Sequence, residues 1–317
     1  MKVAITGGTG FVGRHLATTL TEQGHEVVII SRGIDNRDLA ARSLPNSIFA
    51  AIGTSDVESL TAAFKDCDAV AHLAGINREI GEQTYENVHV KGTQNVVDAA
   101  KSAGIKKILL LSFLRARPNC GSPYHESKWE AEEIVRASGI PYSIFKAGVI
   151  YGKGDHLLDH LSHALHTFPI FPLVGLKPTA MRPLAVEDLA QIMIETIVND
   201  RMHNATFPLT GPEEIDLRIV AQRVGDAIGR HPWIFLCPLF VHKLLAFVFE
   251  RTMKVPLESV AQVKILSESL VEPTEAPDQL PANLQPKTPF SQAQIRAGLP
   301  KPSRFGVKDC LWSKAKA

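Results

Sequence analysis

The feature that most constrains the fold is a run of glycines near the start of the chain, in the stretch Thr6-Gly-Gly-Thr-Gly-Phe-Val-Gly13. This stretch follows a short apolar run, Lys2–Thr6, that is typical of a buried strand. An apolar pattern typical of a helix follows it over Phe11–Gln23. A strand, a glycine-rich turn and a helix in this order indicate a loop that binds a dinucleotide.

Each glycine of the loop has a separate physical task. Gly8 permits the tight turn, Gly10 lets the backbone approach a pyrophosphate, and Gly13 lets helix and strand pack closely. Amides at the start of the helix then point at the anion. A turn without a ligand is the alternative that this context disfavours. The residues predicted to bind the cofactor here are Gly7, Gly8, Thr9, Gly10, Phe11, Val12 and Gly13.

The end of the second predicted strand, Glu26–Ser31, indicates which dinucleotide binds. An Asp or Glu at this point usually binds the ribose hydroxyls of NAD. Here the strand ends in Ser31 and Arg32. A guanidinium pairs well with a phosphate, so we expect NADP(H), bound through Arg32 with a hydrogen bond from Ser31. NAD is the less favoured alternative, with Arg32 in solvent and Asp35 on the ribose.

The first half of the chain alternates apolar strand-like runs with helical patterns, which predicts a parallel sheet covered on both faces. The fold class expected is α/β, a Rossmann-type doubly wound parallel sheet with a smaller, mostly helical C-terminal lobe. The six strands predicted in this half are Lys2–Thr6, Glu26–Ser31, Ser47–Ile52, Ala69–Leu73, Lys107–Ser112 and Tyr142–Lys146.

The predicted domain limits follow from a loosening of this pattern after Tyr151. Residues 1–150 form the dinucleotide-binding domain, and 180–210 return to it. Residues 151–179 and 211–317 form a lobe for a substrate or a partner. The later elements expected are helices at Val186–Val198, Leu217–Ile228 and Pro232–Glu250, a strand at Thr206–Leu209 and an irregular, proline-rich tail at Val271–Pro302.

The stretch Pro232–Phe249 is the most apolar part of the chain. Pro238, His242 and Lys243 interrupt it, and we therefore expect no transmembrane span. Apolar residues occur nearly all round the predicted helix, which favours burial within the fold or a complex. Peripheral docking on a membrane or on a membrane-bound partner through 232–249 is the alternative.

Composition excludes some functions. The formal net charge is +1, which gives no electrostatic reason to expect nucleic acid. The four cysteines lie far apart and form no CxxC pair, so neither a zinc site nor a disulfide framework is expected. A reducing, cytoplasmic compartment fits this cysteine usage.

Tyr124 and Lys128 are four residues apart in the stretch Pro123–Glu133, which places both on one face of a helix. Such a pair can transfer a proton, although an ordinary surface pair is the simpler interpretation of these two residues taken alone.

Five motifs in order resemble the extended or atypical branch of the short-chain dehydrogenases/reductases. They are TGGTGFVG at Thr6–Gly13, HLAG at His72–Gly75, NVHVKGT at Asn87–Thr93, YHESK at Tyr124–Lys128 and PLAVEDLA at Pro183–Ala190. This branch includes nucleotide-sugar epimerases and dehydratases. The segment before Tyr124 and the apolar helix look most like a subgroup that includes the NADPH-binding accessory subunit of respiratory complex I.

The resemblance implies roles for individual residues. Tyr124 would donate or accept the proton, and Lys128 would lower the pKa of Tyr124 and hold the nicotinamide ribose. Further cofactor contacts would come from Leu73, Ala74 and Gly75 on the adenosine and ribose side and from Ala147 and Val149 near the nicotinamide. The long helices of this family often form a dimer face, which leaves a homodimer open.

The sequence departs from the family at the residue that binds the substrate oxygen. Active members carry a Ser or Thr just past the fifth strand, where this chain has Phe113 and Leu114. Ser112 would have to serve as the catalytic hydroxyl, or Ser122 would have to reach in from the next loop. Without either, the loss of one such donor costs about a hundredfold in rate.

Two other groups of residues invite a functional interpretation. His156, His160 and His163 share one helical face, but no further ligand set follows and we expect no metal site. Arg115 and Arg117 would recognise an acidic or phosphorylated substrate, or would cap strand ends and bind solvent. Arg182 lies where this branch often aims a residue at the substrate.

Three functions therefore remain open. The first is an NADP(H)-dependent oxidoreductase or epimerase acting on a small carbonyl or hydroxyl compound, such as a sugar nucleotide or a quinone-related molecule. The second is a non-catalytic NADPH-binding module of a larger complex. The third is a sensor of the NADP(H) redox ratio.

Overall fold

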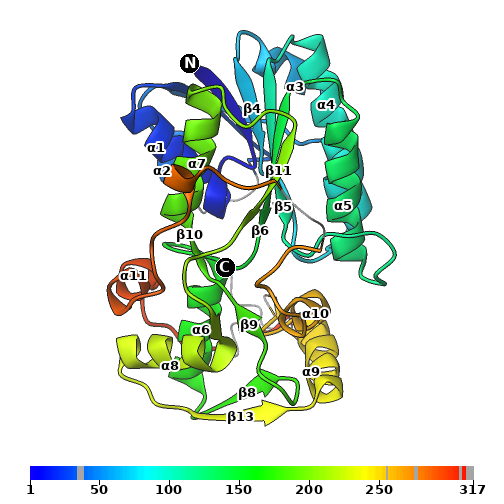
Figure 1. Ribbon diagram of the computed structural model, residues 1–317. Coiled ribbons are helices and arrows are strands. Elements are labelled where there is room, and N and C mark those ends of the chain that lie inside the picture. Colours follow the sequence, from blue (N-terminus) through cyan, green and yellow to red (C-terminus); the bar gives the residue numbers. More distant parts are fainter. Residues whose placement is uncertain (34–38, 255, 275–277, 307–308, 312–317) are drawn as a thin grey trace. The chain divides into compact units, whose positions relative to one another are not determined.

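The computed structural model describes residues 1–33, 39–254, 256–274, 278–306 and 309–311 (Figure 1). The chain divides into two compact units. The first contains Met1–Ala147, Val186–Leu209 and Pro273–Pro286, and the second contains Gly148–Ala185, Thr210–Glu272 and Lys287–Ala317.

A seven-stranded parallel sheet forms the centre of the first unit. Its strand order is β11-β6-β5-β4-β1-β2-β3, and the order reverses between β1 and β4, as expected for a doubly wound sheet. The strands are β1 (Lys2–Thr6), β2 (Glu26–Ser31), β3 (Ser47–Ala51), β4 (Ala69–His72), β5 (Lys107–Phe113), β6 (Tyr142–Ala147) and β11 (Ala205–Leu209). The predicted fold class is therefore confirmed.

Helices cover both faces of this sheet. On one face lie α1 (Phe11–Glu22) and α7 (Val186–Val198), with the short α2 (Leu39–Arg42) beside them (Figure 1). On the other face lie α3 (Val57–Phe64), α4 (Gly92–Ser102) and α5 (Pro123–Arg136) (Figure 1). A π-helical segment, η2 (Glu86–Lys91), leads directly into α4.

Local sequence explains where these helices begin. The side chain of Asp56 accepts a hydrogen bond from the Ser59 amide and caps α3. Pro123 occupies the first turn of α5, where its missing N–H leaves no partner unsatisfied. Between the sheet and these helices, Val70, Ile108 and Phe64 are fully buried in one apolar core.

The second unit combines short strand pairs with helices. The pairs join β7 (Ile150–Tyr151) to β10 (Leu184–Ala185), β9 (Ala180–Met181) to β12 (Ile215–Asp216) and β8 (Ile170–Val174) to β13 (Trp233–Cys237). The helices are α6 (His156–Thr167), α8 (Leu217–Ile228), α9 (Leu239–Thr252), α10 (Val260–Leu266) and α11 (Gln292–Gly298), with a 3-10 turn, η3 (Ala282–Leu284), in the segment that joins the first unit.

The predicted single helix over Pro232–Glu250 is wrong in its first part. Residues Trp233–Cys237 form strand β13, which pairs in parallel with β8, and only Leu239–Thr252 is helical. Pro238 separates the two because proline lacks the amide that a continuing helix needs. The aromatic and β-branched residues before it suit a strand.

The proline-rich tail is more ordered than predicted. It contains α11, which begins where the Ser291 side chain accepts a hydrogen bond from the Gln294 amide. Its segment Pro273–Pro286 belongs to the first unit, where Asp278 and Thr206 exchange hydrogen bonds of 2.8 and 3.0 Å. The wider division into a cofactor domain and a substrate lobe stays a prediction.

Among the residues that the structure describes, no helix is long and apolar enough to cross a membrane. All four cysteines have free thiols.

Candidate functional site

The glycine loop between β1 and α1 packs so tightly that side chains do not fit. Gly7 has φ of +71°, a conformation that favours glycine, and a Cβ added there would lie 2.8 Å from the Cα of Ala74. A Cβ on Gly13 would lie 2.8 Å from the Cα of Gly8. The loop therefore brings α1 against β1, as the sequence predicted, and it also packs against the HLAG segment.

The start of α1 offers open backbone amides. Gly10 is the N-cap and supplies no side-chain acceptor, and the first turn contains no acidic residue. The amides of Phe11 and Val12 have no partner inside the helix because they belong to its first turn. Together with the loop, these amides fit the pyrophosphate of a dinucleotide.

The end of β2 lies beside this loop. The Thr9 hydroxyl donates a hydrogen bond of 2.8 Å to the Ser31 hydroxyl. Arg32 is exposed, and its Cγ lies 3.7 Å from the position that a Cβ on Gly53 would occupy. Gly53 follows β3, so the Arg32 side chain lies at the sheet edge where the adenosine half of a dinucleotide binds in such folds. Asp35, the alternative ribose ligand, lies outside the described residues.

Lys128 occupies the second turn of α5, four residues after Tyr124. Its ammonium donates a hydrogen bond of 2.8 Å to the carbonyl of Leu111 on β5. A Cβ on Gly75 would lie 3.8 Å from Nζ, so the ammonium sits beside the HLAG segment. Burial lowers the pKa of Lys128 to about 8, which the charge of Glu132 partly opposes.

Tyr124 lies among aromatic rings. Ring centroids of Tyr85, His89 and Phe113 lie 5.4 to 5.8 Å from its own, all in edge-on arrangements. Burial raises the pKa of Tyr124, and the neighbouring Tyr85 phenol adds to the rise. The resemblance implied a lowered pKa for Tyr124. In the structure, the raised pKa instead favours the neutral phenol.

The Ser112 hydroxyl forms its hydrogen bond with Glu132, not with Tyr124. Its hydroxyl donates a hydrogen bond of 2.5 Å to Oε1 of Glu132. Glu132 lies eight residues after Tyr124 on α5, about 12 Å further along the helix axis. The next residue, Phe113, places its ring against Tyr124 instead. The catalytic role predicted for Ser112 would therefore require this hydrogen bond to break.

Ser122, the alternative donor, is also buried and occupied. Its hydroxyl lies 2.6 Å from Nδ1 of His125.

The His72 side chain, inside the HLAG motif, is hydrogen-bonded to Thr6 on β1 and to Thr93 on α4. The Thr93 hydroxyl donates to the carbonyl of His89, so it accepts from Nε2 of His72, 3.0 Å away. Nδ1 of His72 then accepts from the Thr6 hydroxyl at 2.6 Å. Burial lowers the pKa of His72 to about 3, with a further contribution from the Lys128 charge. His72 is therefore neutral, and its hydrogen bonds link the strand before the glycine loop to α4.

His89, inside the NVHVKGT motif, connects two segments that contain residues predicted to bind the cofactor, one at Gly75 and one at Lys128. Its Nε2 accepts from the Ile76 amide at 3.1 Å, so Nδ1 carries the proton and donates to the Ser127 hydroxyl at 2.9 Å. Ser127 in turn donates to the carbonyl of Tyr124. Burial lowers the pKa of His89, and the Lys128 charge adds to the effect. The sequence alone predicted no role for His72, His89 or Tyr85, although both histidines lie in motifs that it identified.

The structure brings most predicted cofactor residues to one edge of the first unit. These residues lie at or just after the carboxyl ends of β1, β2, β4 and β6, which meet at the same edge of a parallel sheet; they are the glycine loop, Ser31 and Arg32, Leu73 to Gly75, and Ala147. Val149 belongs to the second unit and is not placed relative to this edge.

The other candidates take part in local contacts. His156 and His160 are ring neighbours at 5.9 Å, and His163 pairs with Asp159 at 3.6 Å. Within the described ranges, no group of three or more His, Cys, Asp or Glu side chains is arranged to hold a metal ion.

The side chains of two candidate arginines, Arg182 and Arg117, make different contacts. Arg182 forms an exposed ion pair with Glu214 at 3.0 Å, within the second unit. Arg117 donates to the carbonyl of Arg115, in the loop after β5.

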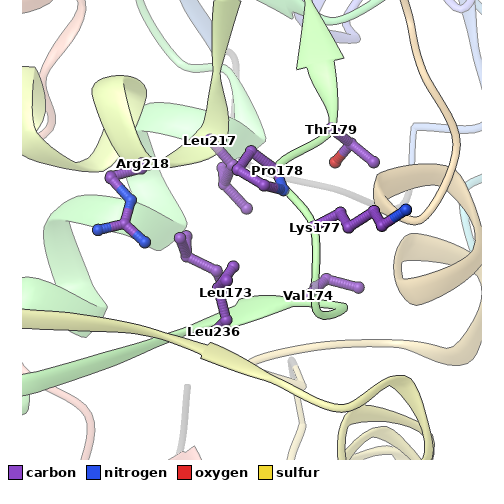
Figure 2. A pocket seen from close by; sticks show the side chains of 8 residues that line it. All are labelled: Leu173, Val174, Lys177, Pro178, Thr179, Leu217, Arg218 and Leu236. Carbon is purple, nitrogen blue, oxygen red and sulfur yellow. The ribbon is translucent and has the colours of Figure 1, made fainter.

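A small pocket of about 220 Å³ lies in the second unit, and none of the residues predicted to bind the cofactor lines it (Figure 2). Lys177 and Arg218 add two cations to a mainly apolar lining, which consists of Leu173, Val174, Lys177, Pro178, Thr179, Leu217, Arg218 and Leu236 (Figure 2).

Comparison with known proteins gives one family. A family model described as the NAD-dependent epimerase/dehydratase family matches residues 3–205. The chain is 26% identical over 296 residues to the mouse (Mus musculus) mitochondrial protein named NADH dehydrogenase (ubiquinone) 1 alpha subcomplex subunit 9, covering 92% of this chain and 78% of that one. It is 22% identical to the 40 kDa subunit of Neurospora crassa mitochondrial NADH-ubiquinone oxidoreductase, covering 82% of this chain and 69% of that one.

Solved structures share the fold. The Thermus thermophilus UDP-glucose 4-epimerase, solved in complex with NAD, superposes with a TM-score of 0.68 at 18% identity, covering 94% of this chain and 97% of that one. The UDP-glucose 4-epimerase of Thermotoga maritima, solved with UDP-glucose, gives a TM-score of 0.69 at 15% identity, covering 94% and 97%.

Proposed function

The chain belongs to the NAD-dependent epimerase/dehydratase family, an extended branch of the short-chain dehydrogenases/reductases, and we propose that it binds NADP(H). The observation that carries this proposal is the glycine loop. Its close packing leaves no room for side chains at Gly7 or Gly13, and it ends at a helix with open, uncapped amides. A loop built only as a turn would not need these two close approaches.

The preference for NADP(H) over NAD rests on Arg32. The end of β2 presents an exposed guanidinium next to Gly53, and no carboxylate among the described residues of that strand end replaces it. A guanidinium forms charge-assisted, bidentate hydrogen bonds with a phosphate. The 2′-phosphate of NADP is therefore the group that Arg32 suits.

Catalysis as an oxidoreductase or epimerase is the first candidate activity, on a sugar nucleotide or a quinone-related compound. Bound NADP(H) would supply or take up a hydride. Lys128, whose ammonium lies beside Gly75, would hold the ribose hydroxyls of the cofactor. Tyr124 would exchange a proton with the substrate, and a nearby Lys128 charge would favour its phenolate once Lys128 leaves the Leu111 carbonyl.

A non-catalytic NADPH-binding module of a larger complex is the second candidate, and Phe113 favours it. A phenyl ring contacts Tyr124 where active members have a hydroxyl, and Ser112 donates to Glu132 instead. The mouse and Neurospora relatives are named as subunits of respiratory NADH dehydrogenases, which agrees with a role in an assembly. A cytoplasmic location stays a prediction for either activity.

One set of variants separates the two candidates. Purified protein would be tested for NADPH oxidation with a panel of quinones and for epimerisation of UDP-sugars, alongside Tyr124→Phe and Phe113→Ser. Turnover by the wild type that Tyr124→Phe abolishes, with NADPH affinity preserved, would establish the enzyme. Tight NADPH binding without turnover, and turnover gained only in Phe113→Ser, would establish the binding module.

A control variant tests whether a Tyr→Phe change elsewhere in the fold has the same effect. Tyr142→Phe changes a partly buried tyrosine on β6 that has no predicted role in the reaction. It should leave both NADPH affinity and turnover unchanged. A matching loss in Tyr142→Phe and Tyr124→Phe would contradict the role proposed for Tyr124.

A further inference from the structure

Helix α9 of the second unit presents an apolar stripe to solvent. Phe240 is 72% exposed, Leu244 63%, Phe247 49% and Val248 42%. Positions i, i+4, i+7 and i+8 lie on one face of a helix, so these four side chains form one continuous strip, here called the α9 stripe. Sequence analysis favoured burial of this helix within the fold or a complex, and burial within the described fold is wrong for this face.

The opposite face of α9 is already fixed to the second unit. Ala246 is fully buried with Val174 and Val263 in one apolar cluster. His242 is 2% exposed and pairs with Glu258 at 2.8 Å, which ties α9 to the segment before α10. Figure 1 shows α9 and α10 packed side by side. The helix is therefore held in place while its stripe stays accessible among the described residues.

Two cations accompany the stripe, and the one carboxylate of α9 is hydrogen-bonded to a backbone amide. Lys243 and Arg251 are exposed, and the Arg251 guanidinium lies 3.4 Å from the centre of the Phe247 ring. The only acidic residue of α9 is Glu250, whose carboxylate accepts a hydrogen bond from the Val260 amide. The exposed face of α9 thus combines large apolar side chains with positive charge.

We propose that the α9 stripe docks on the surface of an anionic phospholipid bilayer. The four apolar side chains would enter the acyl boundary, while Lys243 and Arg251 would remain at the phosphate level. The stripe from Phe240 to Val248 spans about 12 Å along the helix axis, which suits a helix lying flat in the interface. This proposal is independent of the cofactor.

Charge argues against a second copy of the chain as the partner. Two stripes packed face to face would bring two Lys243 and two Arg251 side chains together, and the only carboxylates of α9 near them would be the two Glu250 side chains, each already hydrogen-bonded to a Val260 amide. An anionic bilayer instead supplies the complementary charge, worth about fivefold in affinity for each Lys or Arg near the surface.

A second exposed apolar–basic pair lies next to the start of α9. The Gly175 amide donates to the carbonyl of Cys237, one residue before Pro238 and two before the helix. The next residues, Leu176 and Lys177, leave the strand at this point, and Leu176 is 67% exposed. The same combination of side chains therefore recurs close in the fold to the chain that leads into α9.

The test is flotation of the full chain with vesicles of phosphatidylcholine alone or mixed with phosphatidylglycerol. The wild type should float with the mixed vesicles and should dissociate as NaCl rises from about 0.05 to about 0.5 M. Leu244→Gln should lose flotation. The double variant Lys243→Gln/Arg251→Gln should bind the mixed vesicles about thirtyfold more weakly.

Matched controls use exposed residues of the first unit. Ile48→Gln changes an apolar residue of β3 that is 59% exposed, and Lys101→Gln changes an exposed lysine of α4. Both should float like the wild type, and all variants should keep the melting temperature of the wild type. Two results would overturn the proposal: no flotation of the wild type with anionic vesicles at low salt, or a dimer in sedimentation that Leu244→Gln dissociates without any lipid binding.

Discussion

At the scale of single residues, the candidate site is held by buried polar groups rather than by surface charges. His72 and His89 stay neutral because burial lowers both pKa values. Their hydrogen bonds link Thr6, Ile76 and Ser127, each next to a residue predicted to bind the cofactor. The one cation in this group is Lys128, so its protonation controls the charge available to a bound ribose.

The affinity for NADPH should depend on pH through Lys128. Its pKa is lowered to about 8, so the ammonium is present below that pH and is lost above it. We expect the NADPH dissociation constant to rise between about pH 7 and about pH 9, with a smaller rise in Lys128→Met, which should bind weakly throughout. Isothermal titration calorimetry across this range measures the effect. An unchanged affinity in Lys128→Met would contradict the role given to this residue.

The sequence alone predicted those candidate residues that stand in a characteristic spacing. Tyr124 and Lys128 stand four apart on a helix, and the glycines stand in a fixed pattern, so both could be predicted. The packing of Tyr85 against Tyr124 could not be predicted, because the two residues are 39 positions apart and meet only when η2 packs on α5. The same holds for the hydrogen bond from Ser112 to Glu132.

At the scale of secondary-structure elements, a buried ionic network joins β5, α5 and β6. Glu132 is fully buried, accepts from Ser112 and pairs with Lys146 at 3.1 Å and with Arg136 at 2.9 Å. The Lys146 ammonium also donates to the carbonyl of Ala116, in the loop that leads to Tyr124. This network therefore fixes the position of α5, the helix that carries Tyr124 and Lys128.

Removal of the Glu132 carboxylate should destabilise the protein strongly. Glu132→Ala leaves the Lys146 charge buried without its partner, and we expect a loss of about 3–5 kcal/mol in the free energy of unfolding. The double variant Glu132→Ala/Lys146→Met should recover part of that loss because it removes the stranded charge. Urea denaturation measures both. Equal stability of Glu132→Ala and the wild type would show that the network does not hold α5.

Element prediction succeeded where one signal dominated and failed where two competed. The strands of the central sheet are apolar runs bounded by turns, and all six predicted in the first half are present. Over Pro232–Glu250 a mostly apolar stretch suggested one helix, but Pro238 divides it into a strand and a helix. Helix α11 was missed because its cap, Ser291, lies in a proline-rich segment typical of irregular chain.

At the scale of the whole molecule, the chain forms two units, and we propose a separate binding role for each. The first unit carries the sheet edge proposed to bind NADP(H), and the second carries the α9 stripe proposed to bind lipid. The two surfaces can therefore be tested separately, since variants of α9 should leave cofactor affinity unchanged. Family membership supplies the fold, while the chemistry depends on the residues at the sheet edge.

The central claim is that this chain binds NADP(H) through its glycine loop and Arg32. The most direct test is calorimetric titration of the wild type and Arg32→Ala with NADPH and with NADH. The wild type should prefer NADPH, and Arg32→Ala should lose about tenfold or more in NADPH affinity while its NADH affinity changes little. Equal binding of NADPH and NADH by the wild type would contradict the phosphate role of Arg32, and binding of neither would contradict the claim itself.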